Sequence, residues 1–386
     1  MAHEEINITY NTKITKVEEI MKFYVGRPNI PDIDSFLTKS RTILESKQLT
    51  NHGPMVRELE RRLAEYLGVK HVITVNNATI GLMVVIKALE LTGEVILPSF
   101  TFIASAHVLE WEGIKPVFCD IDPNTHNIDA NKVERLITDK TSAIMGVHIW
   151  GRPCPHDELL TIARKHNIKL FYDAAHAFAT TYKMQPIASL EDISVLSFHA
   201  TKSFNTFEGG AIVTNDDELA KKAELMCRYS FEGEDNVIGL GINAKMTEIH
   251  AAMGLCNLDE YSNVLKHNKE VYEYYKRHLS VINGISIIDY PENEKHNYHY
   301  IITLVDEDIF GRSRNAIHSN LKADGIFVRR YFYPGCHKSE PYISLYPNLN
   351  LPQTDILCAK VLALPGGSGL DNMNQASDIL SIIRSI

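Results

Sequence analysis

The chain has 386 residues, too many for one ordinary core, and its apolar share of 45% and charged share of 23% are usual for a globular protein. A formal net charge of −9 and a pI near 6.0 exclude a general nucleic-acid binder, which needs a basic face. No apolar run reaches the roughly 18 residues that span a membrane, which excludes a transmembrane protein.

The first predicted elements alternate between helix and strand from about residue 54. Residues 55–68 have the apolar spacing of an amphipathic helix that ends at Gly68, and residues 71–75 form a short β-branched strand. Residues 78–91 are mostly apolar, which predicts a helix buried over much of its surface.

Six further apolar runs are predicted to be strands, and helical stretches such as 154–167 separate several of them. Strands that are apolar on both faces and alternate with helices indicate a largely parallel sheet covered on both sides. Ligands bind beyond the carboxyl ends of the strands in such α/β sheets. The six runs are 94–99, 114–121, 141–149, 168–174, 194–198 and 211–215.

The pattern changes near residue 260. Residues 258–280 are predicted to form one long helix that leaves the large domain. A strand at 299–305, a helix at 313–325, a strand at 326–332 and a final helix follow. We therefore expect a large domain over residues 1–262, with the N-terminal segment included, and a smaller α+β domain over residues 263–386.

Cysteine usage and the N-terminal segment predict the compartment. The six cysteines are scattered without a C-x-x-C pair, which fits reduced thiols in the cytoplasm and indicates no metal site. Residues 1–16 lack the apolar stretch of a signal peptide. We expect a cytoplasmic protein that has no membrane or nucleic-acid partner.

Three strand ends carry residues that fit one cofactor. In VNNATIGL (75–82) a polar turn opens a helix, whose free N–H groups favour a phosphate, and Thr79 adds a hydroxyl. By itself this pattern is more often a plain helix cap.

The second strand end carries Asp173, which follows an apolar strand and is followed by Ala-Ala-His. Asp173 is either a helix cap or a buried carboxylate that needs a cation.

The third strand end is SFHATKSFNTFEGG, residues 197–210. A single lysine such as Lys202 is usually a solvated charge. A lysine in a partly buried site is instead deprotonated more easily and can attack an aldehyde. An anion cradle, a carboxylate and a lysine on successive strand ends are what the phosphate, the pyridine nitrogen and the aldehyde of pyridoxal phosphate require.

The chain resembles the sugar aminotransferases of the DegT/StrS type, which have the aspartate-aminotransferase fold (fold type I). The matching segments cover nearly the whole chain, and YDAAHAF (172–178) with SFHATKSFNTFEGGA (197–211) is the most specific pair. The segments GINAKMTEIHAAMGL (241–255) and VRRYFYPGCHKSEPY (328–342) also match. The resemblance implies an α/β large domain with a mixed, mostly parallel sheet and a smaller C-terminal domain.

The resemblance also implies the role of each site residue. Lys202 would form the Schiff base with the cofactor, Asp173 would keep the pyridine nitrogen protonated, and His176 would lie near the other ring face or O3′. Phe102 would stack on the ring, and the phosphate would be bound by Ala78, Thr79 and Ser197. Asn243 would reach the phosphate of the neighbouring subunit, which implies a homodimer with shared active sites.

The implied reaction is amination of a nucleotide-linked keto-sugar. Some members of the family have histidine at the position of Lys202 and are sugar dehydratases. This chain has lysine there and so resembles the aminotransferases. FHATKSFNTFEGGA resembles the enzymes that convert dTDP-4-keto-6-deoxy-D-glucose to dTDP-4-amino-4,6-dideoxy-D-glucose with L-glutamate, the cofactor passing through its pyridoxamine form. The product would enter a surface polysaccharide such as the O-antigen of lipopolysaccharide, or a glycosylated metabolite.

Candidate substrate residues are less specific, and alternative functions stay open. A diphosphate needs cations, for which Arg228, Arg329 and Arg330 are candidates, and ordinary surface charge is the alternative for each. Tyr331 and His337 are further candidates. The rivals are amination of C3, a GDP- or UDP-linked sugar, a lyase or desulfurase, and a non-catalytic nucleotide-sugar-binding regulator that would need no such lysine.

Overall fold

The computed structural model describes residues 22–190, 192–291 and 294–386. The expectation that residues 1–16 carry no signal peptide lies outside these ranges. Within them, every helix is too short or too polar to cross a membrane.

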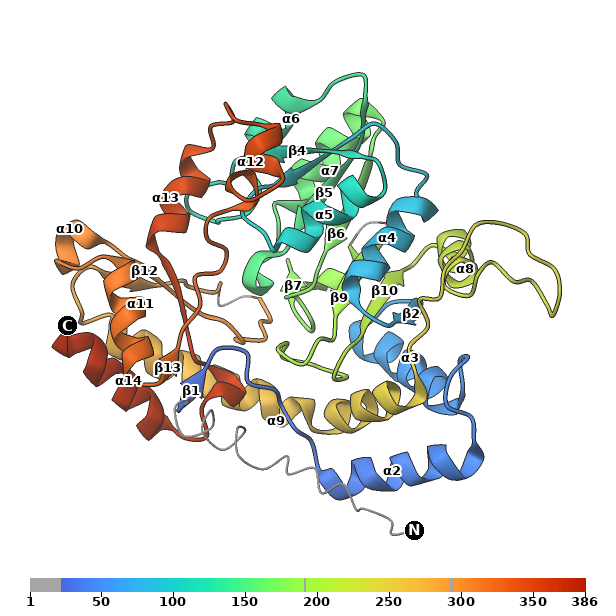
Figure 1. The fold of residues 1–386 in the computed structure, drawn as a ribbon, viewed down its shortest axis with the longest axis horizontal. Coiled ribbons are helices and arrows are strands. Elements are labelled where there is room, and N and C mark those ends of the chain that lie inside the picture. Colours follow the sequence, from blue (N-terminus) through green and yellow to red (C-terminus); the bar gives the residue numbers. More distant parts are fainter. Residues whose placement is uncertain (1–21, 191, 292–293) are drawn as a thin grey trace, which may run out of the picture.

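A seven-stranded sheet forms the centre of the molecule, in the order β2-β10-β9-β6-β5-β3-β4 (Figure 1). β10 runs antiparallel to both of its neighbours, and the other four strand pairs are parallel. The mixed, mostly parallel sheet is confirmed. Its strands are β2 (His71–Val75), β3 (Glu94–Pro98), β4 (Lys115–Cys119), β5 (Thr141–Val147), β6 (Lys169–Asp173), β9 (Ser194–Ser197) and β10 (Gly210–Thr214).

Helices cover both faces of this sheet because successive strand residues point to opposite sides and are apolar on both. Ile96 and Ile144 join one core, whereas Val95 and Ala143 join the other. The first core takes in α3 (Pro54–Leu67), α6 (Ala130–Leu136) and α7 (His156–His166). The second takes in α4 (Ala78–Ala88), α5 (Ile103–Trp111) and α8 (Asp217–Met226).

A long helix, α9 (Glu248–Leu279), connects this sheet to a second, antiparallel sheet. In its first half Ala251, Leu255, Leu258 and Tyr261 join the first core, and its buried hydrophobic residues from Val271 onward join a separate core around the second sheet. We propose the domain boundary in this part of α9, close to residues 262 and 263. The second unit contains β11 (Ile285–Ile287), β12 (Ile301–Val305), β14 (Val361–Leu364), α11 (Arg314–Ala323) and α14 (Met373–Ser385).

Two local differences from the prediction concern this second unit. β1 (Phe23–Tyr24) pairs in parallel with β13 (Ile326–Phe327), so this part of the N-terminal segment lies on the C-terminal unit and not on the large one. The strand predicted over 326–332 ends after Phe327, and only a single bridge, from Arg329 to Ala363, continues it. The chain beyond β13 is thereby directed toward the large sheet.

The remaining helices and strands complete the fold. They are α2 (Ile33–Ser46), β7 (Thr181–Tyr182), β8 (Gln185–Pro186), α10 (Glu307–Phe310), α12 (Tyr342–Leu345) and α13 (Pro352–Lys360), with 3₁₀ turns at Ile149–Gly151, Ile187–Ser189, Cys336–Lys338 and Gly367–Gly369.

Candidate active site

A cavity of about 330 Å³ lies at the carboxyl ends of β6 and β9, where the C-terminal unit faces the large sheet. Nine of the residues predicted from the sequence line it together: Ala78, Thr79, Phe102, Asp173, His176, Ser197, Lys202, Arg329 and Tyr331. We refer to it as the catalytic cavity.

The start of α4 forms one wall of the catalytic cavity. The side chain of Asn77 caps the helix by accepting the N–H of Ile80 at 2.9 Å, and the first N–H groups of a helix have no carbonyl partner within it. Gly210 lies directly beneath, where a Cβ would stand 2.9 Å from the nitrogen of Ala78. Glycine therefore lets β10 approach the helix start closely, and the N–H groups and dipole of α4 favour a phosphate there.

Asp173 is a buried carboxylate at the end of β6. Its Oδ2 accepts from the hydroxyl of Ser105 at 2.7 Å and its Oδ1 from the N–H of Ala175 at 3.1 Å. Burial raises the pKa of Asp173, while these hydrogen bonds and the charge of Lys202 oppose the rise. Among the described residues no cation lies within ion-pair distance, so Asp173 can receive a protonated ring nitrogen.

Lys202 reaches the same cavity from the turn after β9. Burial lowers the pKa of its ammonium group to about 8, and the negative charge of Asp173 opposes this. Its Nζ donates to the hydroxyl of Tyr300 at 3.3 Å. With a pKa of about 8, roughly a tenth of Lys202 is free amine at pH 7, far more than of an ordinary lysine, and the free amine is the form that acts as a nucleophile or a base.

Tyr300 was not predicted from the sequence as a site residue. It lies next to β12 in the C-terminal unit, far from Lys202 in the chain, and its ring packs edge-on against His176 at 4.9 Å. Burial raises the pKa of its phenol well above the ordinary value, so the hydroxyl stays neutral. The only sequence signal was a tyrosine within the strand predicted over 299–305, which does not distinguish it from core tyrosines.

His176 has a defined protonation state in the cavity. Burial and the nearby Lys202 hold its pKa well below the ordinary value, so the ring is neutral. The N–H of Trp150 donates to Nδ1 at 3.2 Å, which places the ring proton on Nε2. The ring of His176 stacks on that of Phe332, with 5.6 Å between the ring centroids. The side chain of Phe102 is 56% exposed and lies at the mouth of the cavity.

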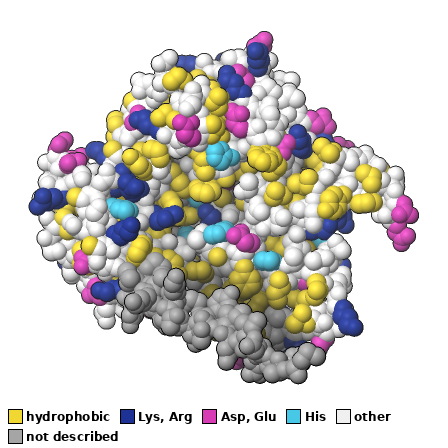
Figure 2. All heavy atoms as spheres, in the orientation of Figure 1, with side chains coloured by type: hydrophobic (Ala, Val, Ile, Leu, Met, Phe, Trp, Pro, Cys, Tyr) yellow, Lys and Arg dark blue, Asp and Glu magenta, His cyan; other side chains and the backbone are white. Residues whose placement is uncertain are grey.

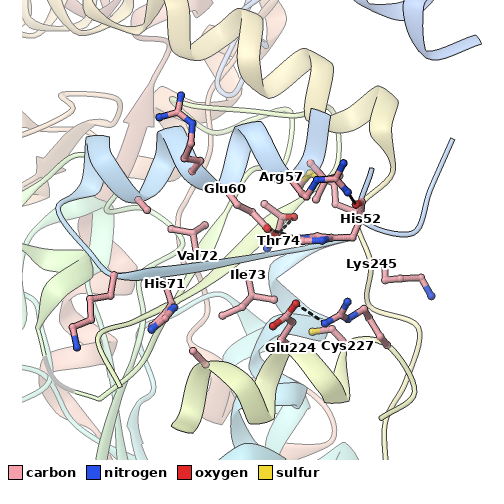
Figure 3. Close-up of a pocket in the computed structure, with 17 residues that line it drawn as sticks. His52, Arg57, Glu60, His71, Val72, Ile73, Thr74, Glu224, Cys227 and Lys245 are labelled. Atoms are coloured by element: carbon pink, nitrogen blue, oxygen red, sulfur yellow. Dashed lines mark hydrogen bonds and ion pairs between the residues drawn. The ribbon is translucent and has the colours of Figure 1, made fainter. Parts of the chain in front are cut away.

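Four predicted residues do not line the catalytic cavity, and one of them, Arg330, lines an adjoining groove of about 340 Å³. Arg228 lines a second hollow of about 340 Å³ beside the edge strand β2, between α3 and α8, and pairs with Glu224 there (Figure 3). Asn243 is exposed and bridges to the backbone of Arg228. His337 is buried, with Nδ1 2.7 Å from the hydroxyl of Ser99 and Nε2 3.2 Å from Asp355, and lines neither hollow.

The catalytic cavity combines an anion cradle, a buried carboxylate without a cation, an amine of lowered pKa and aromatic side chains. This donor set fits the phosphate, ring nitrogen, aldehyde and ring of pyridoxal phosphate. It does not resemble a metal centre, and the described part of the chain contains no group of three or more His, Cys, Asp or Glu that could hold a metal ion.

Comparison with known proteins gives matches over almost the full length. Residues 32–384 match the model of the DegT/DnrJ/EryC1/StrS aminotransferase family. The chain is 41% identical to the dTDP-4-amino-4,6-dideoxy-D-glucose transaminase of Shigella dysenteriae over 363 residues, 94% of this chain and 97% of the relative.

Solved structures share the fold. DesI, determined in the presence of its TDP-sugar product, is 42% identical with a TM-score of 0.90, over 94% of this chain and 92% of DesI. A second structure is that of Spr1654 from Streptococcus pneumoniae, a putative sugar aminotransferase, in its PLP form. It is 27% identical with a TM-score of 0.84, over 93% of this chain and 98% of Spr1654.

Proposed function

Because the chain belongs to the DegT/DnrJ/EryC1/StrS aminotransferase family, we propose that it is a pyridoxal-phosphate-dependent aminotransferase of nucleotide-linked keto-sugars. The substrate we propose is dTDP-4-keto-6-deoxy-D-glucose, converted to dTDP-4-amino-4,6-dideoxy-D-glucose with L-glutamate as donor. The names of the Shigella relative and of DesI support this choice. The observation that carries the proposal is the convergence of Lys202, Asp173 and the start of α4 on one cavity.

The residues of the catalytic cavity are proposed to hold the cofactor as follows. Lys202 would bond to its aldehyde, Asp173 would pair with its ring nitrogen, and Phe102 and His176 would lie against its ring. The phosphate would be held by the start of α4 (Ala78 and Thr79) and by Ser197. When bound, the cofactor supplies the electron sink that amino-group transfer requires.

The chain's own chemistry centres on moving protons with Lys202. Its free amine removes the proton from Cα of the donor, and in the second half of the reaction it delivers a proton to C4 of the sugar. The pKa of about 8 suits both directions, because the ammonium form predominates at pH 7 while roughly a tenth of Lys202 remains free amine. Tyr300 holds Nζ from the C-terminal unit, so it positions the base.

For the substrate, Arg329 and Tyr331 remain our proposed contacts because they line the cavity. The guanidinium of Arg329 lies 5.3 Å above the ring of Tyr331 and donates to its hydroxyl at 3.3 Å. We leave His337 out, because its side chain is buried between Ser99 and Asp355. Arg228 could contact a substrate only through another subunit, since it lies outside the cavity of its own chain.

We further propose a homodimer in which Asn243 completes the site of the partner. The segment between α8 and α9 extends from the body of the molecule (Figure 1), and its side chains are unusually apolar for such an exposed position. Covering them with a second copy would remove this surface from water. The exposed apolar residues are Tyr229, Phe231, Val237, Ile238 and Leu240.

Mixing two inactive variants tests the shared site. Lys202→Ala and Asn243→Ala, refolded together, would form heterodimers in which one of the two sites is intact. We expect activity in the mixture that neither variant has alone. A mixture as inactive as its components, with heterodimers demonstrated by mass spectrometry, would exclude the shared arrangement.

We propose the cytoplasm as the setting of the reaction. All six cysteines are free and buried in the structure, which fits a reducing compartment.

Absorption spectroscopy tests the reaction itself. The protein loaded with pyridoxal phosphate should show a visible band that L-glutamate bleaches and dTDP-4-keto-6-deoxy-D-glucose restores. NMR of the product should show the new amino group on C4; an amino group on C3, or restoration only by a GDP- or UDP-linked sugar, would replace the named substrate. The absence of a visible band after addition of pyridoxal phosphate would refute the proposed aminotransferase function.

A further inference from the structure

A row of hydrogen-bonded side chains leads from the loop after β3 to the carboxylate of Asp173. The hydroxyl oxygens of Thr101 and Ser105 lie 2.9 Å apart, and the hydroxyl of Ser105 lies 2.7 Å from Oδ2 of Asp173. All three residues are buried, with 3%, 0% and 6% of their surface exposed in that order. Since Asp173 lines the catalytic cavity, the row ends where the ring nitrogen of the cofactor is proposed to bind.

The row has a single direction while Asp173 is ionised. A carboxylate can only accept hydrogen bonds, so the one proton of the Ser105 hydroxyl is directed at Asp173. The oxygen of Ser105 is then free to accept, and Thr101 is its donor. Hydrogen bonds in such a row polarise one another, so Thr101 strengthens the bond from Ser105 to Asp173.

Burial makes these donors decisive for the charge of Asp173. Figure 2 shows Lys, Arg, Asp and Glu side chains spread over one face of the molecule, where water solvates their charges. Asp173 is withdrawn from water, and burial raises the pKa of its carboxyl group because it disfavours the charged form. The hydrogen bond from Ser105 opposes this rise in pKa more than the N–H of Ala175 or the charge of Lys202 does.

The fold fixes both hydroxyl groups in place. Ser105 belongs to the first turn of α5, and its N–H donates to the carbonyl of Phe102 at 3.1 Å. The loop before α5 is held from the C-terminal unit, because Cys336 donates through its N–H to the carbonyl of Ser99 at 2.9 Å and through its thiol to the carbonyl of Thr101 at 3.6 Å. The donors are therefore in position before a cofactor binds, as an electrostatically preorganised site requires.

The ring nitrogen of pyridoxal phosphate and Asp173 would share one proton. A carboxylate that accepts strong hydrogen bonds is a weaker base, so the proton stays on the ring nitrogen. Without the donor, Asp173 would take the proton more readily and the ring nitrogen would become neutral. A neutral ring is a poorer electron sink than a protonated one.

We propose that Ser105, with Thr101 behind it, is a positioning residue that keeps Asp173 ionised and oriented, so that the shared proton stays on the ring nitrogen of the cofactor. The inference rests on the proposed function, since it takes pyridoxal phosphate as the cofactor and Asp173 as the partner of its ring nitrogen. Neither Ser105 nor Thr101 was predicted from the sequence as a site residue.

Nitrogen-15 NMR tests the proposal on the protein loaded with pyridoxal phosphate that is labelled at the ring nitrogen, because the chemical shift of this nitrogen differs between its protonated and neutral forms. The wild type should give the signal of the protonated form at neutral pH. Ser105→Ala should move the signal toward the neutral form. Ser105→Cys should lie between the two, because a thiol is a weaker donor than a hydroxyl.

Thr101→Val removes only the second donor of the row, so it should shift the signal in the same direction as Ser105→Ala and by less. Ser194→Ala is the matched control. Ser194 is a buried serine of β9, beside the strand that ends at Asp173, and its hydroxyl has no hydrogen-bond partner among the described residues. Its loss should leave both the nitrogen signal and kcat unchanged.

Steady-state kinetics give a second readout. Ser105→Ala should lower kcat about 10-fold and leave the KM for L-glutamate within about twofold, because Ser105 acts through Asp173 and does not line the cavity itself.

Contrary outcomes are distinct for the positioning role and for the reaction. A nitrogen signal that is the same in Ser105→Ala and in the wild type, or a neutral ring nitrogen in the wild type, would overturn the role of Ser105. If Ser105→Ala does not fold, as judged by circular dichroism, Thr101→Val decides, and an unchanged signal there overturns the proposal equally. A wild type that shows no visible band with pyridoxal phosphate would instead refute the proposed function, so the two failures are distinguishable.

Discussion

The catalytic cavity and the hollow beside β2 have nearly the same volume, about 330 and 340 Å³, and both contain charged residues. Their charges are arranged differently. In the hollow beside β2 (Figure 3) they form ordinary ion pairs, such as His52 with Glu60 at 2.6 Å and Arg228 with Glu224. In the catalytic cavity, Lys202 and Asp173 are desolvated without a direct ion-pair partner among the described residues, and burial shifts both of their pKa values toward the neutral forms.

This difference shows that the state of the charges, and not the size of a hollow, identifies the reactive site. A buried charge without a partner is unfavourable for folding and persists where a ligand completes it. Paired charges at a surface contribute little to either stability or chemistry. Four substitutions test this contrast, from the largest expected effect to the smallest.

Lys202→Ala should abolish turnover, with a loss of at least about 10⁴-fold, because it removes both the base and the point of covalent attachment. Steady-state assay of amino-sugar formation measures it. Lys70→Ala, which removes a lysine paired with Asp217 in the hollow beside β2, should stay within about twofold of wild type. Substantial turnover by Lys202→Ala would contradict the contrast between the two hollows.

Asp173→Asn should lower turnover roughly 10²- to 10³-fold and should lower the pKa of Lys202 below about 8. The sign follows from the charge: Asp173 stabilises the ammonium form, so its removal favours the free amine. The pH dependence of Lys202 acylation in the cofactor-free protein, followed by mass spectrometry, measures the pKa directly. An unchanged or raised pKa would show that Asp173 does not act on Lys202.

Tyr300→Phe should reduce kcat about 3- to 10-fold and leave KM nearly unchanged, because it removes one hydrogen bond to Lys202 while keeping the ring. The apparent pKa in the pH profile of kcat should shift in the same direction as the pKa of Lys202. Tyr275→Phe is the matched control, since the hydroxyl of Tyr275 is buried without a hydrogen-bond partner among the described residues. If Tyr300→Phe and Tyr275→Phe had the same kcat and the same pH profile, Tyr300 would contribute packing alone and would not position Lys202.

Glu60→Gln should leave kcat unchanged and lower the free energy of unfolding by about 0.5–1 kcal/mol at pH 6 and by less at pH 8. Its hydrogen bond raises the pKa of His52 in the folded protein. The ion pair therefore stabilises fully below the unfolded pKa of about 6.5 and is lost as the pH rises through the higher folded value. Denaturant unfolding of wild type and Glu60→Gln at pH 6 and pH 8 measures the loss in the free energy of unfolding. A loss that is larger at pH 8 than at pH 6 would contradict the prediction.

Much of the fold was predictable because its determinants are local. All seven strands of the central sheet match the predicted apolar runs, with β10 beginning one residue earlier than predicted, and α3 is capped by Gly68, which adopts the left-handed conformation that favours glycine. Both cores follow from strands that are apolar on both faces, since alternate residues of one strand join different cores. Lys202 and Asp173 could be proposed from sequence because Asp173 ends a buried strand and Lys202 lies in the turn that follows another.

Other features could not be predicted because they depend on contacts between distant segments. Tyr300 reaches Lys202 across 98 residues. The strand expected over 326–332 is interrupted after Phe327, where the chain leaves β13, and this exposes Arg329 to the catalytic cavity and Arg330 to the groove that adjoins it. His337 had the residue type of a site histidine, yet packing between Ser99 and Asp355 buries it away from the cavity.

The amino-acid sequence by itself determined the order of strands and helices along the chain, the polar helix start at residues 75–82, and the presence of a carboxylate and a lysine after two buried strands, because these follow from periodicity and from what ends each strand. Tertiary structure alone decided which cations remain unpaired, which pKa values shift and which residues of the C-terminal unit border the site. Those properties depend on desolvation and on distances between atoms far apart in the chain, and neither is encoded in local sequence.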